Sequence, residues 1–245
     1  MCDYAEAEKY FNKTLLINPA FIAARWQKSL MYLKWEGKTG KAREPIAELL
    51  KISESVSDPL IFETSAILDI YDGNYKKAFN DISSWNFDII DPQVYFNLKP
   101  MMIARVYSLM NNPGMAYEYY RSSLVTLETK ILKDPDDPRL YSAIGIAYAG
   151  LGQKEKAIEA GRKGVALMPV EKEAYRGVFR VEDLARIYVM VGEYDKALEQ
   201  IKLLLAIPSR LSVQLLLLDP AWKPLWNLPE FKKIIKIASP DVLQI

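Results

Sequence analysis

The chemistry open to this chain is limited by a residue that it lacks, because its 245 residues include no histidine. Histidine changes charge near neutral pH, is the commonest zinc ligand, and is the base that activates the serine of a catalytic triad. Its absence argues against all three kinds of site. The single cysteine, Cys2, excludes a disulfide within the chain and fits a reducing compartment only weakly.

Two short patterns resemble ligand sites but lack residues that such sites need. Gly37-Lys38-Thr39 matches the end of a phosphate-binding loop, but that loop needs a glycine five residues before the Gly-Lys pair, where the chain has Tyr32. The aspartates of 134–137 are separated by a proline and do not follow a calcium-loop pattern, so a helix-capping turn is favoured. We therefore expect no enzyme, no cofactor and no metal site.

Composition and charge indicate a chain that can bury a core and stay in solution. Hydrophobic residues make up 50% and charged residues 26%, and the net charge is +1 with no block of like charge. This balance favours neither nucleic acid nor an anionic membrane as a partner. No apolar run reaches the roughly 18 residues of a membrane span, and no basic segment followed by an apolar core marks a signal peptide. The expected location is the cytoplasm.

The elements that position any binding residue are predicted to be helices arranged in repeats. A small residue of the second helix of each unit recurs at spacings of 35 to 41 residues. These residues are Ala7, Ala42, Ala78, Ala116, Ala157 and Ala197. Such self-similarity over most of a chain is the signature of a solenoid. Residues 3–19 match only the second helix of a unit, which favours a start within a repeat. Between the later units, residues 86–93 are predicted to be a loop and residues 170–177 a polar insertion.

The most regular unit spans residues 138–169 and has two amphipathic helices around a turn at 150–153. Bulky residues lie on one face of its first helix, and small residues lie where the two helices must touch. The positions that carry this pattern are Tyr141, Ile144, Gly145, Tyr148, Gly152, Ala157 and Pro169. The unit resembles a tetratricopeptide repeat. It departs from that pattern at Gly161, where an aromatic is common, and at Gly164, where alanine is common.

This resemblance implies an all-α, right-handed α-solenoid. We expect about five and a half repeats over residues 1–210, the first of them partial, and a C-terminal capping segment over 211–245, because a solenoid has an apolar end that must be covered. In that segment a short helix, a loop fixed by Asp219, Pro220, Trp222 and Pro224, and a last helix from Pro229 are predicted. The stretches 137–139, 181–185 and 218–225 are also similar to the repeat region at the C-terminus of many bacterial and archaeal signalling proteins, a resemblance that covers roughly the last half of the chain. In such proteins the repeats follow kinase, nucleotide-cyclase or DNA-binding domains.

The family resemblance implies that the first helix of each repeat faces a concave groove. The residues expected to line it are Met101, Arg105, Arg139, Ser142, Ile146, Arg186 and Met190. Arginine suits a carboxylate or an acidic peptide, because its planar fork binds such groups through two hydrogen bonds. The alternative is that the arginines are solvated or pair with Glu63 and Glu182. The lysines and asparagines with which chaperone-binding relatives hold a peptide C-terminus are not present at the corresponding positions.

The predicted function is protein–protein interaction, by a scaffold or sensor module that holds a partner segment in the groove, within a larger signalling protein. The partner is expected to be a protein or peptide, with an acidic segment favoured. The alternative is a structural module that self-associates into a homo-oligomer. An enzyme is the third reading, and the missing histidine and nucleophile motifs argue against it.

Overall fold

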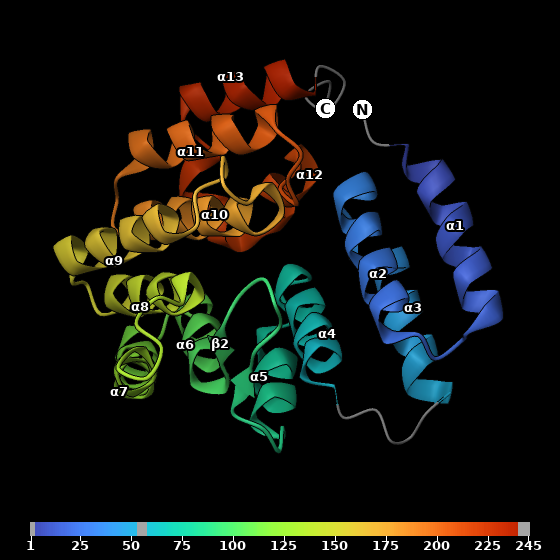
Figure 1. Cartoon of the computed structure of the whole chain (residues 1–245), viewed down its shortest axis with the longest axis horizontal. Helices are drawn as coiled ribbons and strands as arrows, with labels where there is room; N and C mark the ends of the chain where they lie inside the picture. The colour runs from blue at the N-terminus through green and yellow to red at the C-terminus, as the bar shows by residue number, and fades with distance from the viewer. Residues whose placement is uncertain (1–2, 53–57, 240–245) are drawn as a thin grey trace. The chain divides into compact units, whose positions relative to one another are not determined.

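The computed structural model describes residues 3–52 and 58–239 and divides into two compact units, Met1–Trp85 and Asn86–Ile245. Both units are built of helix pairs in which each helix packs on the next one along the chain (Figure 1). The chain is therefore all-α in character, as predicted. The described part also holds two strands of two residues each.

In its described residues, the first unit contains five helices. They are α1 (Tyr4–Ile17), α2 (Ile22–Glu36), α3 (Thr39–Ile52), α4 (Pro59–Tyr71) and α5 (Tyr75–Ser83). Helix α1 packs on α2 but has no buried residue, so it lies at the edge of this unit. The pairs α2–α3 and α4–α5 each match one predicted repeat, and α1 matches the lone second helix predicted for residues 3–19.

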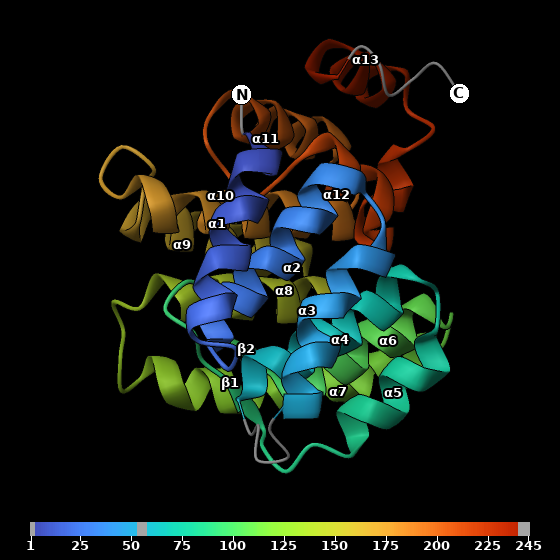
Figure 2. The ribbon, with the colours of Figure 1, turned by 90° about the vertical axis from the view of Figure 1, so that its right-hand side faces the viewer.

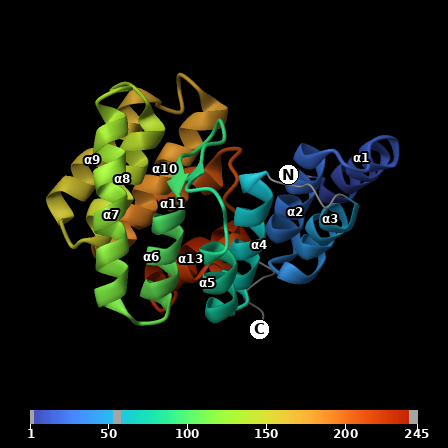
Figure 3. The same cartoon turned by 90° about the horizontal axis from the view of Figure 1, so that it is seen from below.

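The second unit contains three further helix pairs and a C-terminal region. The pairs are α6 (Lys99–Leu109) with α7 (Pro113–Ile131), α8 (Pro138–Gly150) with α9 (Lys154–Leu167), and α10 (Ala174–Met190) with α11 (Tyr194–Ala206). Figure 3 shows α7, α8 and α9 side by side, and α10 packs on both α8 and α9. The first helices of the pairs, α6, α8 and α10, thus follow one another as repeats do.

The same turn closes each pair of the second unit. The residue after the turn donates its backbone N–H to the carbonyl of a tyrosine five residues earlier, at 2.9 Å, for Gln153 to Tyr148 and for Glu193 to Tyr188. The backbone between them reaches positive φ at Gly152 (71°) and Gly192 (77°), a conformation that glycine adopts without steric cost. The repeat is therefore visible in backbone geometry as well as in sequence.

The predicted close contact between the paired helices is confirmed. Ala157 is fully buried, and a Cβ atom added at Gly145 would lie 3.0 Å from the Ala157 carbonyl oxygen and 2.6 Å from Ile187 Cδ1. The equivalent alanines at 42, 78, 116 and 197 are also buried, at no more than 4% exposed. Ala7 is only partly buried, because α1 lies at the edge of the first unit.

Two stretches differ from the sequence prediction. Residues 170–177 were expected to be a polar insertion, but α10 begins at Ala174, where the Glu173 carboxylate accepts the Tyr175 N–H and caps the helix. The loop predicted at 86–93 contains β1 (Ile89–Ile90), which pairs antiparallel with β2 (Asn97–Leu98). The added start of α10 is about one helical turn, and each strand has two residues. Both are too short for hydrophobic periodicity to predict them.

The C-terminal region has the predicted short helix, loop and last helix. Helix α12 (Val213–Leu218) leads into the 3₁₀ helix η1 (Pro220–Leu225), and α13 (Pro229–Ala238) then packs on α11 (Figure 2). Apolar side chains of this region belong to the same buried cluster as those of α10 and α11, with Trp222 and Leu225 fully buried. The predicted division at 210/211 into repeats and a cap stays a prediction.

Candidate partner-binding face

The seven residues predicted to line a groove lie on the first helices of three successive pairs, α6, α8 and α10. Their accessibilities differ. Met190 is 41% exposed and Ile146 is half-buried, whereas the side chains of Arg105 and Arg139 are 25% exposed and that of Arg186 is 16% exposed. The structure therefore leaves five of the seven side chains at least partly accessible.

Met101 and Ser142 are corrections to the predicted groove, because both are buried. Met101 packs in an apolar cluster with Leu98 and Leu127, so the β2 strand and α7 cover the first turn of α6. Ser142 lies against α9, where a Cβ at Gly164 would be 3.2 Å from its hydroxyl oxygen. That oxygen is buried and has no hydrogen-bond partner among the described residues.

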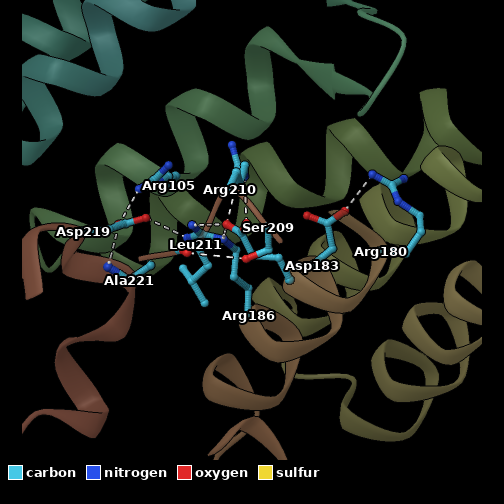
Figure 4. A network of polar contacts seen from close by, with 10 residues as sticks. Arg105, Arg180, Asp183, Arg186, Ser209, Arg210, Leu211, Asp219 and Ala221 are labelled. Atoms are coloured by element: carbon cyan, nitrogen blue, oxygen red, sulfur yellow. Dashed lines mark hydrogen bonds and ion pairs between the residues drawn. The ribbon is translucent and has the colours of Figure 1, made fainter. Parts of the chain in front are cut away.

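Arg105 and Arg186 converge on one carboxylate, which belongs to Asp219 (Figure 4). Arg105 of α6 donates from Nη2 to Asp219 Oδ1 at 2.7 Å, and Arg186 of α10 donates from Nη1 to Asp219 Oδ2 at 2.8 Å. Asp219 itself is 1% exposed. The face of α6 and α10 thus already holds an acidic residue, supplied by the turn between α12 and η1.

The same turn brings an aromatic ring onto Arg186. The guanidinium carbon of Arg186 lies 4.7 Å from the centre of the Trp222 ring, within the range of a cation–π contact. Asp219 also caps η1, because its Oδ1 accepts the Ala221 N–H at 3.0 Å. One carboxylate therefore fixes the local turn and joins two helices that are distant in sequence.

A second buried carboxylate, Glu182, extends the network along α10. Arg210 donates from Nε and Nη2 to its two oxygens at 2.7 Å each, and Arg186 donates from Nη2 to Oε1 at 2.9 Å. The predicted alternative that groove arginines pair with Glu182 is therefore correct for Arg186. Glu63, the other residue of that alternative, is buried in the first unit.

Positive neighbours keep both carboxylates charged. Burial acts to raise the pKa of Glu182, but Arg210 and Arg186 outweigh it and lower that pKa to about 2. The pKa of Asp219 is likewise held far below its usual value, because Arg105 and Arg186 outweigh its desolvation. The network thus alternates cation and anion in the order Arg105, Asp219, Arg186, Glu182 and Arg210.

Arg139 lies apart from this network, at the start of α8. Its guanidinium donates to Asp137 at 2.8 Å, to Asp91 at 2.6 Å and to the Pro92 carbonyl at 2.8 Å. Desolvation of Asp137 opposes its ionisation, but bonds from Arg139 outweigh this and lower its pKa. Of the three arginines predicted to line the groove, two therefore share one carboxylate. The third, Arg139, connects α8 to the loop after β1.

Sequence reasoning missed the pair formed by the buried Arg180 and the partly buried Asp183. Arg180 is 1% exposed and donates to the Val94 carbonyl at 2.7 Å, with Asp183 at 3.1 Å. Burial lowers the pKa of Arg180 and raises that of Asp183. Two charged residues three positions apart on a helix usually lie on its solvated face. Here residues 94–96 pack into the neighbouring apolar clusters, and the Val94 carbonyl accepts the bond from Arg180.

One of the predicted repeats matches a known family. Residues 138–169 match the family model described as "Tetratricopeptide repeat", the same bounds as the most regular predicted unit. A solved structure titled "MamA 41-end from Desulfovibrio magneticus RS-1" aligns over 82% of this chain and 93% of that chain, with 19% identity and a TM-score of 0.33. No curated protein sequence matches the chain. Across the described residues, no helix combines the length and apolarity needed to cross a bilayer.

Proposed function

We propose that this tetratricopeptide-repeat protein is a non-enzymatic interaction scaffold that holds a partner segment against α6, α8 and α10. The observation that supports this is the arrangement around Asp219. Side chains from the first helices of two separate repeats meet on one acidic residue and its neighbouring aromatic ring. A face that can hold such a turn has the charge and the apolar surface to recognise acidic segments.

The accessible part of this face includes Met190, which lies one helical turn after Arg186 on α10. Methionine adapts its flexible thioether to differently shaped partners, so it suits a binding surface. On α6 and α8, the side chains of Arg105 and Arg139 are also partly accessible. We propose that a partner segment lies across these residues, with apolar contacts at Met190 and Ile146 and acidic contacts at the arginines.

A photo-reactive amino acid placed at Met190 tests this assignment in the cells that produce the protein. The matched control is Leu203 on α11, which is 45% exposed, close to the 41% of Met190, but lies on a second helix. We expect discrete cross-linked proteins, identified by mass spectrometry, from position 190 and not from position 203. Equal cross-linking at both positions, or none at 190, would contradict the proposed face.

The wider setting is also a proposal. The similarity of the second half of the chain to repeat regions of signalling proteins supports a role beside an effector such as a kinase, a nucleotide cyclase or a DNA-binding domain, in the cytoplasm. In that setting the scaffold would select which partner reaches the effector. Identification of such an effector among the proteins cross-linked at position 190, or in the same polypeptide, is the expected result. Partners unrelated to signalling would contradict it.

A further inference from the structure

The segment that contacts Arg105 and Arg186 comes from the end of the second unit and makes contacts typical of a bound ligand. We call residues 212–228 the resident segment. It follows α11 in the chain, packs on α10 through η1, and leads into α13, which packs on α11. Its Asp219 and Trp222 are three residues apart, and both contact Arg186. One arginine therefore binds two side chains that lie within one helical turn of each other.

The face under the resident segment needs an anion. Arg105 and Arg186 come from helices of different repeats and each bonds one of the two oxygen atoms of the Asp219 carboxylate (Figure 4). Two guanidinium groups that converge on one point repel each other when no negative charge lies between them. A partner that removes Asp219 from this position must therefore supply an acidic group of its own.

The fit of the resident segment is incomplete at one atom. The Nε1–H of Trp222 is buried and has no hydrogen-bond partner among the described residues, whereas Trp226 Nε1 donates to the Leu216 carbonyl at 2.9 Å. A buried donor without an acceptor costs stability. A partner with a ring that lacks this donor, such as phenylalanine, would fill the same site without that cost.

We propose that the resident segment is an internal ligand, and that partner segments bind the same face by displacing it. The partner class is a peptide segment with an acidic residue followed three positions later by a large aromatic residue. This inference rests on the proposed scaffold function and adds both the partner's chemistry and its regulation. An internal ligand has an effective concentration in the millimolar range on a short connection, so it excludes weak partners until its own contacts are loosened.

The test uses the full chain and a fluorescent peptide of residues 217–227, measured by fluorescence anisotropy. Asp219→Asn removes the charge that holds the resident segment while keeping the shape of its side chain. We expect the peptide to bind the Asp219→Asn chain at least about tenfold more tightly than the wild-type chain, because the internal competitor is weakened. The matched control is Asp134→Asn, at an exposed aspartate of the loop before α8, which should bind like wild type.

Two further measurements establish that the peptide uses the same arginines. A peptide that carries asparagine in place of aspartate should not bind the Asp219→Asn chain, and adding Arg105→Gln to that chain should abolish binding of the original peptide. Trp222→Ala provides a second opened chain, in case Asp219→Asn fails to fold, because it removes the ring that contacts Arg186 and keeps the carboxylate between the arginines. Circular dichroism of each variant checks that the helices are retained.

The proposal is overturned if a folded, opened chain binds the peptide no better than wild type. It is also overturned if the opened chain self-associates more strongly than the wild-type chain as its concentration rises, because the occupant is then a second copy of the chain. The peptide assay needs no cellular partner, so its outcome is independent of cross-linking at Met190. Peptide binding without cross-linked partners would refute the scaffold function and support the internal ligand. Cross-linked partners without peptide binding would support the scaffold function and refute the internal ligand.

Discussion

At the scale of single residues, the face of α6 and α10 depends on two buried carboxylates. Glu182 is 3% exposed and Asp219 is 1% exposed, and each accepts hydrogen bonds from two arginines. A buried ion pair adds little net stability over an apolar replacement, but removing one of its partners leaves the other charge uncompensated. These residues therefore fix which groups meet at the face, and their loss is costly.

We predict that Glu182→Gln destabilises the second unit by about 3–5 kcal/mol, because the side chains of Arg186 and Arg210 lose their shared negative charge. Thermal unfolding followed by circular dichroism measures the effect. The control is Glu118→Gln, which breaks an exposed pair with Arg121 on α7 and should shift the midpoint little. Equal shifts for the two variants would show that the buried network is not a source of stability.

The pH dependence of stability follows from the same groups. The pKa of Glu182 is about 2 in the folded chain, against a reference of 4.5. A lowered carboxyl pKa gives stability that is present above the unfolded pKa and lost as the pH falls toward the folded one. We expect the melting midpoint to fall between about pH 5 and pH 2, and less steeply in Glu182→Gln. Identical pH profiles would assign acid sensitivity to other carboxylates.

The sequence predicted part of this network and missed the rest for a physical reason. Arginines at 105 and 186 stood out from their helical positions, and the pairing of Arg186 with Glu182, four residues earlier on one helix, is a local contact. Asp219 was assigned to a turn, which is correct, since it caps η1. Its bonds to α6 and α10 depend on tertiary packing and have no signature in the spacing of residues.

At the scale of elements, the helix pairs depend on close approach. The backbone of α8 at Gly145 lies so near Ala157 of α9 that an added Cβ would be 3.0 Å from the Ala157 carbonyl oxygen, tighter than an ordinary van der Waals contact. The sequence predicted this contact because small residues recur at that place in each unit. It did not predict β1, β2 or the first turn of α10, because these short pieces are fixed by caps and pairing with neighbours.

We predict that Ala157→Asp destabilises the α8–α9 pair by about 4 kcal/mol or more, since a carboxylate there is buried and unpaired. The control is Ala166→Asp on the same helix, where the side chain is exposed and the charge stays solvated. A circular dichroism melt compares the two. A normal midpoint for Ala157→Asp would contradict the placement of α9 against α8.

At the scale of the whole molecule, exposed apolar side chains on α1 favour self-association as the second candidate function. Leu16 and Ile17 are 83% and 88% exposed, and Tyr10 is 60% exposed. These side chains lie on a helix without a buried residue. Single exposed apolar residues are normal on proteins, but several on one edge helix are typical of a surface that binds another chain.

We predict that Leu16→Glu reduces any concentration-dependent dimer, because burying a charge without a partner opposes association. Leu132, at the end of α7, is also 83% exposed, so Leu132→Glu is a control matched in residue type and accessibility. Light scattering over a concentration series measures the mass of each variant. If both variants and the wild type are monomers throughout, α1 does not mediate self-association.

The bond between Arg105 and Asp219 also determines when the second unit can be completed during synthesis. The two residues are separated by 114 positions in the chain. Closing so long a stretch of chain is entropically costly. The contact is therefore expected to form only after the intervening helices have folded. On the ribosome, the helix pairs of 99–206 can therefore assemble first. Arg105 and Arg186 are paired with the Asp219 carboxylate only after the residues that follow α11 have been synthesised.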